Sequence, residues 1–288
     1  MARHDGNTPA RQSRPPPARG TSGSESQAPA AERYDAPGDE PLAIAATLTL
    51  DQPFRFDRGL AKRLRMREVN AKEAFTLRDG SGAYFRAGLK EYDARGGLAV
   101  AYERMSRSPE PTVDLTLACA VLARQRMHGV VQKATELGVR RIVPLLTDHS
   151  VPPDGLGHEQ AHAWAGHVAR AARQCRRSSL PHLLAPAALD AFLASPLFAA
   201  ADLRLFLDDR SDPAPAPAEP PQPRRIVLLT GPEGGFSDAE RQRLAAAARP
   251  WVLGGRVLRA ETAVLAGLTA VHMTWGDFNE SHVVAGNQ

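Results

Sequence analysis

Two glycine-rich segments combine a flexible backbone with charged side chains that could do chemistry. The first, 228-LLTGPEGGFSDAE-240, ends an apolar strand in a turn of three glycines and a proline. The second, 251-WVLGGRVLRAETAVLAGLTAVHMTW-275, also ends an apolar strand in glycines, and Arg256, Arg259 and Glu261 follow. Open α/β sheets bind ligands at the carboxyl ends of their strands, where unpaired charges near buried surface are costly. We therefore expect one ligand site; the alternatives are an ordinary β–α turn and a structural Arg–Glu pair.

The first segment differs from the common nucleotide-binding motifs. It is not G-x-G-x-x-G, and it lacks the G-K-[ST] of a phosphate-binding loop. Ser237 and Glu240 are spaced as a capping box, which predicts the start of a helix there. Since glycine has no Cβ, we expect the main chain of this bend to approach a ligand closely.

A metal-binding pattern occurs at 158-HEQAH-162. It fits H-E-x-x-H, in which two histidines one helical turn apart hold zinc and the glutamate acts as a base. The motif lies at the start of a predicted helix, and His167 falls on a different face of that helix, so no third ligand completes the set. We predict no metal, and a zinc metallopeptidase is kept as an alternative.

The second half of the chain alternates helices with strands. Five apolar residues between 126 and 139 recur at helical spacing and predict a helix: Met127, Val130, Val131, Ala134 and Leu137. Gly138 is expected to end that helix, and a second helix is expected over roughly 158–177. The apolar runs VRRIVPLL, LRLFLD, IVLLT and WVL predict strands. This alternation indicates an α/β domain with a parallel sheet covered on both faces.

Residues 42–110 predict a smaller, mostly β module. LAIAATLTL, FTLRDGSGAYFRAGLKEY and GLAVAYERM alternate as short strands do, with a turn at DGSG. The segment RGLAKRLRMREV places five basic residues among twelve. It is either a patch that faces RNA or an ordinary charged helix.

The bulk composition describes a globular chain with a mild positive charge. The 288 residues are 43% hydrophobic, and the formal net charge is +4, which permits a nucleic-acid partner without requiring one. No 18-residue apolar run predicts a membrane span, and two cysteines cannot form a disulfide framework. Residues 1–41 are predicted to be a disordered tail, and the Pro-rich stretch 209–225 a surface insert.

The motifs together resemble one enzyme family. GPEGGFSDAE, LGGRVLRAETA and a closing WGDF resemble the bacterial 16S rRNA uridine-N3 methyltransferases, which belong to the SPOUT class of knotted, S-adenosylmethionine-dependent enzymes. QKATELGVRRIVPLLTDHSV and RQCRRSSLP are similar to further stretches of that family. The resemblance implies an α/β, trefoil-knotted methyltransferase domain over residues 113–280, preceded at 42–112 by a PUA-like RNA-binding β-barrel domain.

The resemblance also implies a function. The implied reaction is methylation of N3 of a uridine in 16S rRNA of the assembled small ribosomal subunit, with S-adenosyl-L-methionine as the cofactor. The implied enzyme is a cytoplasmic homodimer that does not contact membranes. The alternative is a non-catalytic RNA-binding protein, which would not bind the cofactor. Near 122-LARQRM-127 the family commonly has Lys-Gly-Asp where this chain has Ala-Arg-Gln, and we expect the extra arginine to compensate.

Site residues follow from the same resemblance. Arg259, with Arg256 second, is expected to stabilise the developing uridine anion, while Glu261 either accepts the N3 proton or orients an arginine. Arg65 is an implied RNA contact, and Arg177 is expected either to bind RNA or to help close the site. The residues expected to bind the cofactor are Leu229, Gly231, Glu233, Gly234, Leu253, Gly255 and Leu258. A further set of residues is expected to lie near the dimer contact or the RNA, or else to form surface salt bridges: Lys133, Glu136 and Thr147.

Overall fold

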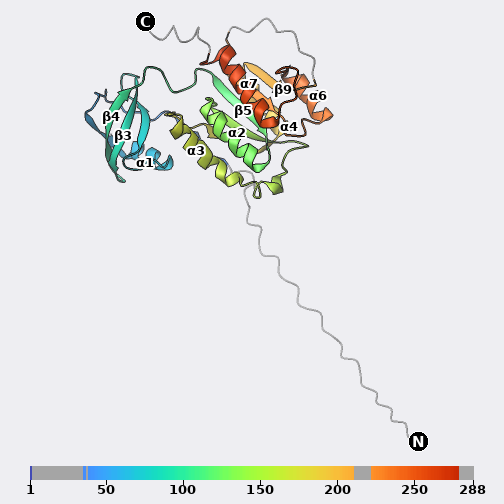
Figure 1. The fold of residues 1–288 in the computed structure, drawn as a ribbon, viewed down its shortest axis with the longest axis horizontal. Helices are drawn as coiled ribbons and strands as arrows, with labels where there is room; N and C mark the ends of the chain where they lie inside the picture. Colours follow the sequence, from blue (N-terminus) through green and yellow to red (C-terminus); the bar gives the residue numbers. More distant parts are fainter. Residues whose placement is uncertain (2–34, 37, 211–221, 279–288) are drawn as a thin grey trace.

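Two sheets organise the chain, one in each part of Figure 1. The structure is a computed structural model, and it describes residues 1, 35–36, 38–210 and 222–278. The predicted tail and Pro-rich insert therefore lie largely outside the described residues. The boundary of the tail is corrected, because Ala36 pairs with Leu183 and Asp39 with Leu180 in isolated β-bridges. The last residues assigned to the tail are thus part of the folded body.

The N-terminal module is a four-stranded antiparallel sheet with strand order β1-β4-β3-β2. Its elements are β1 (Pro53–Asp57), α1 (Arg58–Met66), β2 (Ala74–Arg78), β3 (Tyr84–Tyr92) and β4 (Gly96–Arg104). The DGSG turn joins β2 to β3 as predicted. Within the described residues β1 and β2 are the end strands of this sheet and do not pair with each other, so the predicted β-barrel is not detected.

The strand predicted in LAIAATLTL is wrong. Residues 42–50 form a covering segment whose only described bridge joins Ala43 to Arg78, and the first true strand is β1. Leu42 and Leu48 are buried against the module core. The backbone N–H of Leu48 donates to the Asp79 carboxylate over 3.0 Å, so a side chain replaces the strand partner that the alternating pattern suggested.

The second sheet is entirely parallel, which confirms the predicted α/β class. Its order is β11-β9-β10-β5-β6-β7, with β8 also paired to β6. The strands are β5 (Asp114–Ala120), β6 (Arg141–Leu146), β7 (His182–Leu183), β8 (Ala187–Ala188), β9 (Leu203–Leu207), β10 (Arg225–Thr230) and β11 (Arg249–Trp251). Their apolar side chains divide between two cores, one on each face.

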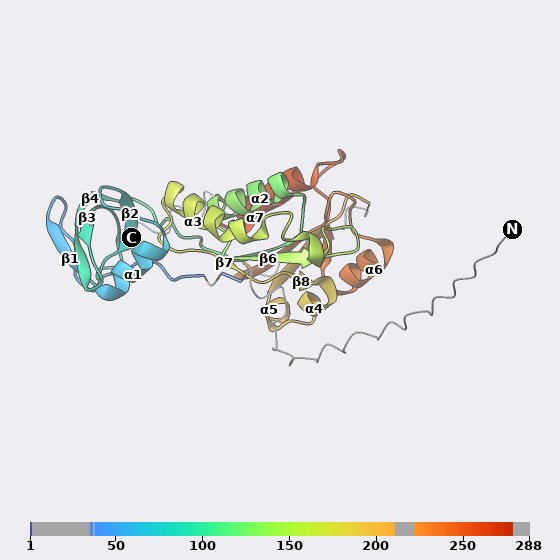
Figure 2. The same ribbon diagram turned by 90° about the horizontal axis from the view of Figure 1, so that it is seen from below.

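Helices cover both faces of this sheet (Figure 2). One face carries α2 (Arg124–Glu136), α3 (Trp164–Gln174) and α7 (Ala260–Trp275). The opposite face carries α4 (Leu189–Leu193), α5 (Pro196–Ala199) and α6 (Asp238–Ala247). α7 follows the edge strand β11 but packs on α2 and the inner strand β10, so the chain returns from the edge to the middle of the sheet.

The helix predicted over 158–177 begins later than expected. Gln160 has a left-handed backbone with φ of 54°, which no continuous helix tolerates. Turns and two short 3₁₀ segments, η2 (Pro153–Gly155) and η3 (Ala161–Ala163), precede α3. The HEQAH motif is therefore not one face of a helix. The Glu159 carboxylate accepts the backbone N–H of Arg124, and no three potential ligands gather as a metal site among the described residues.

Candidate active site

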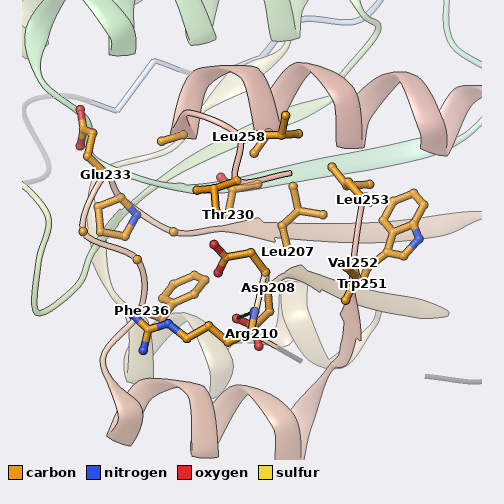
Figure 3. A pocket seen from close by; sticks show the side chains of 18 of the residues that line it. Leu207, Asp208, Arg210, Thr230, Glu233, Phe236, Trp251, Val252, Leu253 and Leu258 are labelled. Atoms are coloured by element: carbon orange, nitrogen blue, oxygen red, sulfur yellow. Dashed lines mark hydrogen bonds between the residues drawn. The ribbon is translucent and has the colours of Figure 1, made fainter. Parts of the chain in front are cut away.

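A cavity of about 250 Å³ lies at the carboxyl ends of β9, β10 and β11. Both glycine bends line it, together with the segment that follows β9, as Figure 3 shows. Its apolar wall includes Leu207, Trp251, Leu253 and Leu258. The two bends thus meet in one place at the carboxyl edge of the sheet, although the strands that they follow, β10 and β11, are separated by β9.

The first bend is held by the helix that it opens. Ser237 is the N-cap of α6: its Oγ accepts the backbone N–H of Glu240 over 3.3 Å, and Glu240 Oε2 accepts that of Ser237 over 2.9 Å. The other Glu240 oxygen accepts the backbone N–H of Asp148 over 2.9 Å. The predicted capping box is confirmed, and it also ties the bend to the loop after β6.

Protein contacts give a second reason for glycine in the first bend, beside the close approach of a ligand that the sequence predicts. A Cβ on Gly231 would lie 3.2 Å from the Phe236 ring, and one on Gly234 would lie 3.2 Å from the His149 Cβ. Protein atoms therefore restrict these two positions before any ligand does. Gly235 has φ of +73°, which favours glycine on conformational grounds alone.

The positions expected to bind a cofactor fall into two groups. Five line the cavity: Gly231, Glu233, Gly234, Leu253 and Leu258. Leu229 does not line it; the residue is fully buried within β10, in the core beneath the sheet. Gly255 is exposed and also does not line the cavity, although its neighbour Gly254 does, with φ of +125°.

The charged residues of the second bend point in different directions. Arg256 is exposed and lines the cavity. Arg259 is the exposed N-cap residue of α7 and does not line the cavity, although its neighbours Leu258 and Ala260 do. Glu261, in the first turn of α7, faces α2, and its Oε2 lies 3.6 Å from Nε of Arg126.

Arg126 also contacts the first bend. Its Nη1 lies 2.7 Å from Oε1 of Glu233, which accepts in addition the backbone N–H of Ala123 over 3.3 Å. Burial alone would raise the pKa of Glu233, but these hydrogen bonds and the Arg126 charge outweigh it and hold that pKa below its ordinary value. Glu233 is thus an ionised residue with a fixed partner.

Sequence reasoning missed the acidic wall of the cavity. Asp208 and Asp209 directly follow β9 and line it, together with Arg210 and Arg241. Asp208 is buried, and its Oδ2 accepts Nη2 of Arg241 over 2.8 Å; this hydrogen bond raises the pKa of Arg241. The signal was available, because Asp208 follows LRLFL at the carboxyl end of a strand adjoining β10.

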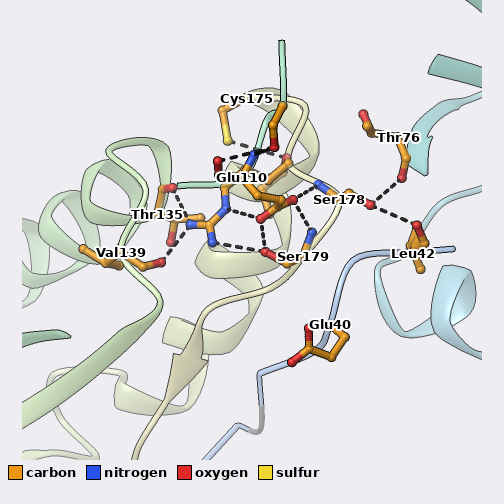
Figure 4. Close-up of polar contacts among 12 residues, drawn as sticks. Glu40, Leu42, Thr76, Glu110, Thr135, Val139, Cys175, Ser178 and Ser179 are labelled. Atoms are coloured by element: carbon orange, nitrogen blue, oxygen red, sulfur yellow. Dashed lines mark hydrogen bonds and ion pairs between the residues drawn. The ribbon is translucent and has the colours of Figure 1, made fainter. Parts of the chain in front are cut away.

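Arg177 lies at the junction between the two parts of the chain, which corrects its predicted RNA contact. Its partners Glu110, Thr135 and Val139 are labelled in Figure 4. The side chain is buried and donates to the carbonyls of Thr135 and Val139 over 3.0 and 2.8 Å. The Glu110 carboxylate lies 3.7 Å from its Nε. Burial lowers the pKa of Arg177 and the Glu110 charge opposes that shift. The guanidinium is enclosed by protein, so RNA cannot reach it in this arrangement.

The same junction joins the module to the parallel-sheet domain. Glu110 Oε1 accepts the backbone N–H groups of Ser178 and Ser179 over 2.7 and 2.8 Å. The Ser178 hydroxyl donates to the carbonyls of Thr76 and Leu42 over 3.1 and 3.3 Å, and both belong to the N-terminal module. Buried polar groups thus position one domain on the other.

Other predicted contacts are on the surface. Arg65, in α1, is exposed; its guanidinium carbon lies 5.2 Å from the centre of the Tyr92 ring, and its Nη2 donates to the Asp93 carbonyl over 3.3 Å. Lys133 and Glu136 form a salt bridge of 2.9 Å within α2, in line with the surface-pair alternative. The Thr147 backbone N–H donates to Ser150 Oγ over 2.9 Å.

Comparison with known proteins indicates what this architecture resembles. The model of the RNA methyltransferase domain family matches residues 108–272. A ribosomal RNA small subunit methyltransferase E of Synechocystis is 31% identical over 212 residues, which cover 72% of this chain and 68% of that protein. Among the described residues, no helix has the length and apolar character to cross a membrane.

Two solved structures are similar over nearly their whole length. The ribosomal RNA small subunit methyltransferase E of Neisseria gonorrhoeae, bound to S-adenosyl methionine, is 27% identical, with a TM-score of 0.60 over 83% of this chain and 99% of that one. A Legionella pneumophila structure described as a methyltransferase with bound cofactor SAM is also 27% identical, with a TM-score of 0.58 over 82% and 98% of the two chains.

Proposed function

Because this chain belongs to the RNA methyltransferase domain family, we propose that it methylates N3 of a uridine in 16S rRNA with S-adenosylmethionine as the methyl donor. The observation that supports this most strongly is the cavity where the two glycine bends meet, at the carboxyl ends of β9, β10 and β11. The relatives whose structures superpose over nearly their full length contain the same cofactor.

The lining of the cavity fits this cofactor chemically. Leu253, Leu258 and Trp251 offer an apolar surface of the kind that an adenine ring requires. Asp208 and Asp209 place carboxylates at another wall, where hydroxyl or ammonium groups can donate hydrogen bonds to them. When bound, the cofactor supplies an electrophilic methyl group on a sulfonium, and the residues of this chain hold and orient the reactants.

The chain must favour the deprotonated uracil ring, because N3 is a poor nucleophile while it bears a proton. Arg256 provides a cation at the cavity wall, and Arg259 lies between two lining residues at the start of α7. A fixed cation stabilises negative charge as it develops on the ring. The contact of Glu261 with Arg126 supports the role of orienting an arginine over that of accepting the N3 proton.

We further propose that the parallel-sheet domain is knotted and that the N-terminal module is PUA-like and binds RNA. The return of α7 from the edge of the sheet to its middle supports the first proposal. The exposed basic side chains of α1, including Arg58, Lys62 and Arg65, support the second. Substrate RNA of the small subunit would place the enzyme in the cytoplasm.

The outer face of α7 supports a homodimer. An apolar groove there is lined by Leu265, Ala266, Ala270 and Met273, and the Met273 side chain is 57% exposed. A second copy of this chain can cover such a face on a long helix. Light scattering should give the mass of a dimer at micromolar concentration, and a monomer would contradict this part of the proposal.

Two measurements test the proposed reaction. Calorimetric titration with S-adenosylmethionine should show saturable binding, which the non-catalytic alternative does not predict. Nucleoside mass spectrometry of 16S rRNA from cells lacking the gene should show loss of 3-methyluridine, restored by the intact gene. Unchanged 3-methyluridine in those cells would reject the assignment.

A further inference from the structure

One arginine outside the cavity contacts an acidic residue from each side of it. Arg126 lies in the first turns of α2 and does not line the cavity. Its Nη1 lies 2.7 Å from Oε1 of Glu233, in the first bend, and its Nε lies 3.6 Å from Oε2 of Glu261, in the first turn after the second bend. A single guanidinium therefore connects three elements that are far apart in the sequence.

The two carboxylates depend on that guanidinium for charge compensation. Glu233 and Glu261 have side chains only 33% and 27% exposed. Oε2 of Glu261 is buried and has no hydrogen-bond partner among the described residues, so the nearby Arg126 charge compensates it. Two partly buried carboxylates that share one site repel each other unless a cation neutralises them.

The remaining charged residues of the cavity pair elsewhere or face another wall. Asp208 is bound by Arg241. Arg256 lines the cavity, and in the part of the chain that the structure describes the ion pairs of Glu233 and Glu261 are with Arg126. In Figure 3 the Glu233 side chain points away from Asp208 and Thr230, out of the middle of the cavity. Of the three residues Glu233, Arg126 and Glu261, only Glu233 thus belongs to the lining that a ligand would touch, whereas Arg126 and Glu261 lie outside it.

We propose that Arg126 is a positioning residue of the methyl-transfer site, and that it holds the glycine bend 231–235 and the start of α7 together before the cofactor arrives. This inference rests on the proposed function. Glycine bends have many accessible conformations, and fixing a site in its binding conformation reduces the cost of binding. Without Arg126 the two glutamates would repel each other and the cavity would widen.

The test is calorimetric titration of S-adenosylmethionine into the full chain and its variants. Arg126→Gln should raise Kd about five-fold, because the variant loses the ion pairs that hold Glu233 and Glu261. The kcat at saturating cofactor should change less than KM for the cofactor, because Arg126 touches no reactant. Arg126→Lys should keep Kd nearer to that of the unmodified chain.

A double variant separates charge from packing. If repulsion between the glutamates causes the loss, Arg126→Gln combined with Glu261→Gln should bring Kd back to that of Glu261→Gln alone. Arg124→Gln is the matched control, because Arg124 lies in the same helix and its guanidinium donates to the His158 carbonyl. Thermal unfolding of each variant without cofactor should confirm that all of them fold.

The outcomes are distinguishable. A Kd of Arg126→Gln within two-fold of the unmodified chain, or a double variant no tighter than Arg126→Gln, overturns the positioning role and leaves the proposed function standing. An unmodified chain that does not bind S-adenosylmethionine overturns both.

Discussion

An arginine–glutamate pair lies at the domain junction, and another lies beside the cavity, at the contact of Arg126 with Glu233, which we call the mouth. The first pair is buried and the second is partly exposed to solvent. At the junction, the side chains of Arg177 and Glu110 are only 3% and 7% exposed, and each has further hydrogen bonds. At the mouth, Arg126 is 42% exposed and Glu233 is 33% exposed. The first pair is enclosed by protein, whereas the second remains partly open to solvent.

The difference shows how one pair type serves two purposes. Removing one member of a buried pair leaves an uncompensated charge and costs far more than removing an exposed partner. Stability should therefore depend on the junction, while cofactor affinity and turnover should depend on the mouth. Four predictions test this separation, beginning with the largest expected effect.

Replacing Glu110 with alanine should destabilise the protein by about 3–5 kcal/mol, because it leaves the Arg177 guanidinium buried without its carboxylate. Denaturant unfolding measures this directly. The matched control is Glu103→Ala, which removes the partner of Arg176 from a pair with side chains 43% and 53% exposed and should cost at most about 1 kcal/mol. If the two variants lose similar amounts of unfolding free energy, the buried and exposed pairs do not differ in their contribution to stability.

Replacing Arg256 or Arg259 with alanine should lower kcat about a hundred-fold, or about 2.7 kcal/mol, if each stabilises the developing uridine anion. Cofactor affinity should stay within a few-fold. Methyl transfer to rRNA with a labelled donor gives kcat, and calorimetry gives Kd. Arg243→Ala serves as control, because that residue pairs with Asp190 away from the cavity. Full activity of Arg259→Ala would exclude it from the mechanism.

Replacing Gly254 with alanine should destabilise the second bend by about 1–2 kcal/mol, because φ of +125° is unfavourable for any residue with a Cβ. Cofactor affinity should fall with it, since Gly254 lines the cavity. In the matched control, Gly255→Ala, the added Cβ meets no atom within 4 Å and φ is not positive. Titration with S-adenosylmethionine and denaturant unfolding compare the two variants. Equal affinities and equal stabilities would show that the positive φ of Gly254 does not limit either property.

The smallest predicted effect is a pH dependence of the unfolding free energy, caused by Asp277, which follows the end of α7. Burial alone would raise the pKa of Asp277, but its contacts with His272 and Thr112 outweigh burial and lower that pKa to about 2. A lowered pKa means that the ionised form stabilises the fold above pH 4 and that this contribution disappears as the pH falls toward 2. After reduction for its partial exposure, the contribution should be about 1 kcal/mol.

Unfolding of the unmodified chain and of Asp277→Asn, compared at several pH values, isolates that contribution. The difference in unfolding free energy should be present at pH 7 and shrink below pH 4. A difference that does not change with pH would mean that the contacts of Asp277 with Thr112 act through geometry and not through charge.

Much of the fold could be predicted because local patterns determine it. The stripe of Met127, Val130 and Val131 is buried in α2 as expected, and the capping box at Ser237 starts α6 where predicted. Failures arose where a distant partner overrode the local pattern. The Asp79 carboxylate holds Leu48 in a covering loop, and a left-handed Gln160 delays α3.

The site was predicted in outline and corrected in detail. Both bends line one cavity, but Leu229 is buried beneath it and Arg177 lies in the domain junction. Neither position could be assigned from the sequence, because burial depends on which elements pack around a residue. Asp208 was missed for a different reason: aspartates that follow a strand, as Asp208 and Asp209 do, resemble ordinary turn residues.

The sequence by itself determined the type of most elements of the parallel-sheet domain and the two bends, since apolar periodicity, glycines and capping residues act over a few neighbouring positions. Tertiary structure alone decided which charges meet. It placed Arg126 between Glu233 and Glu261 and buried Arg177 against Glu110. Electrostatic interactions depend on distance and burial in space, and those quantities exist only after the strands have paired and the helices have packed.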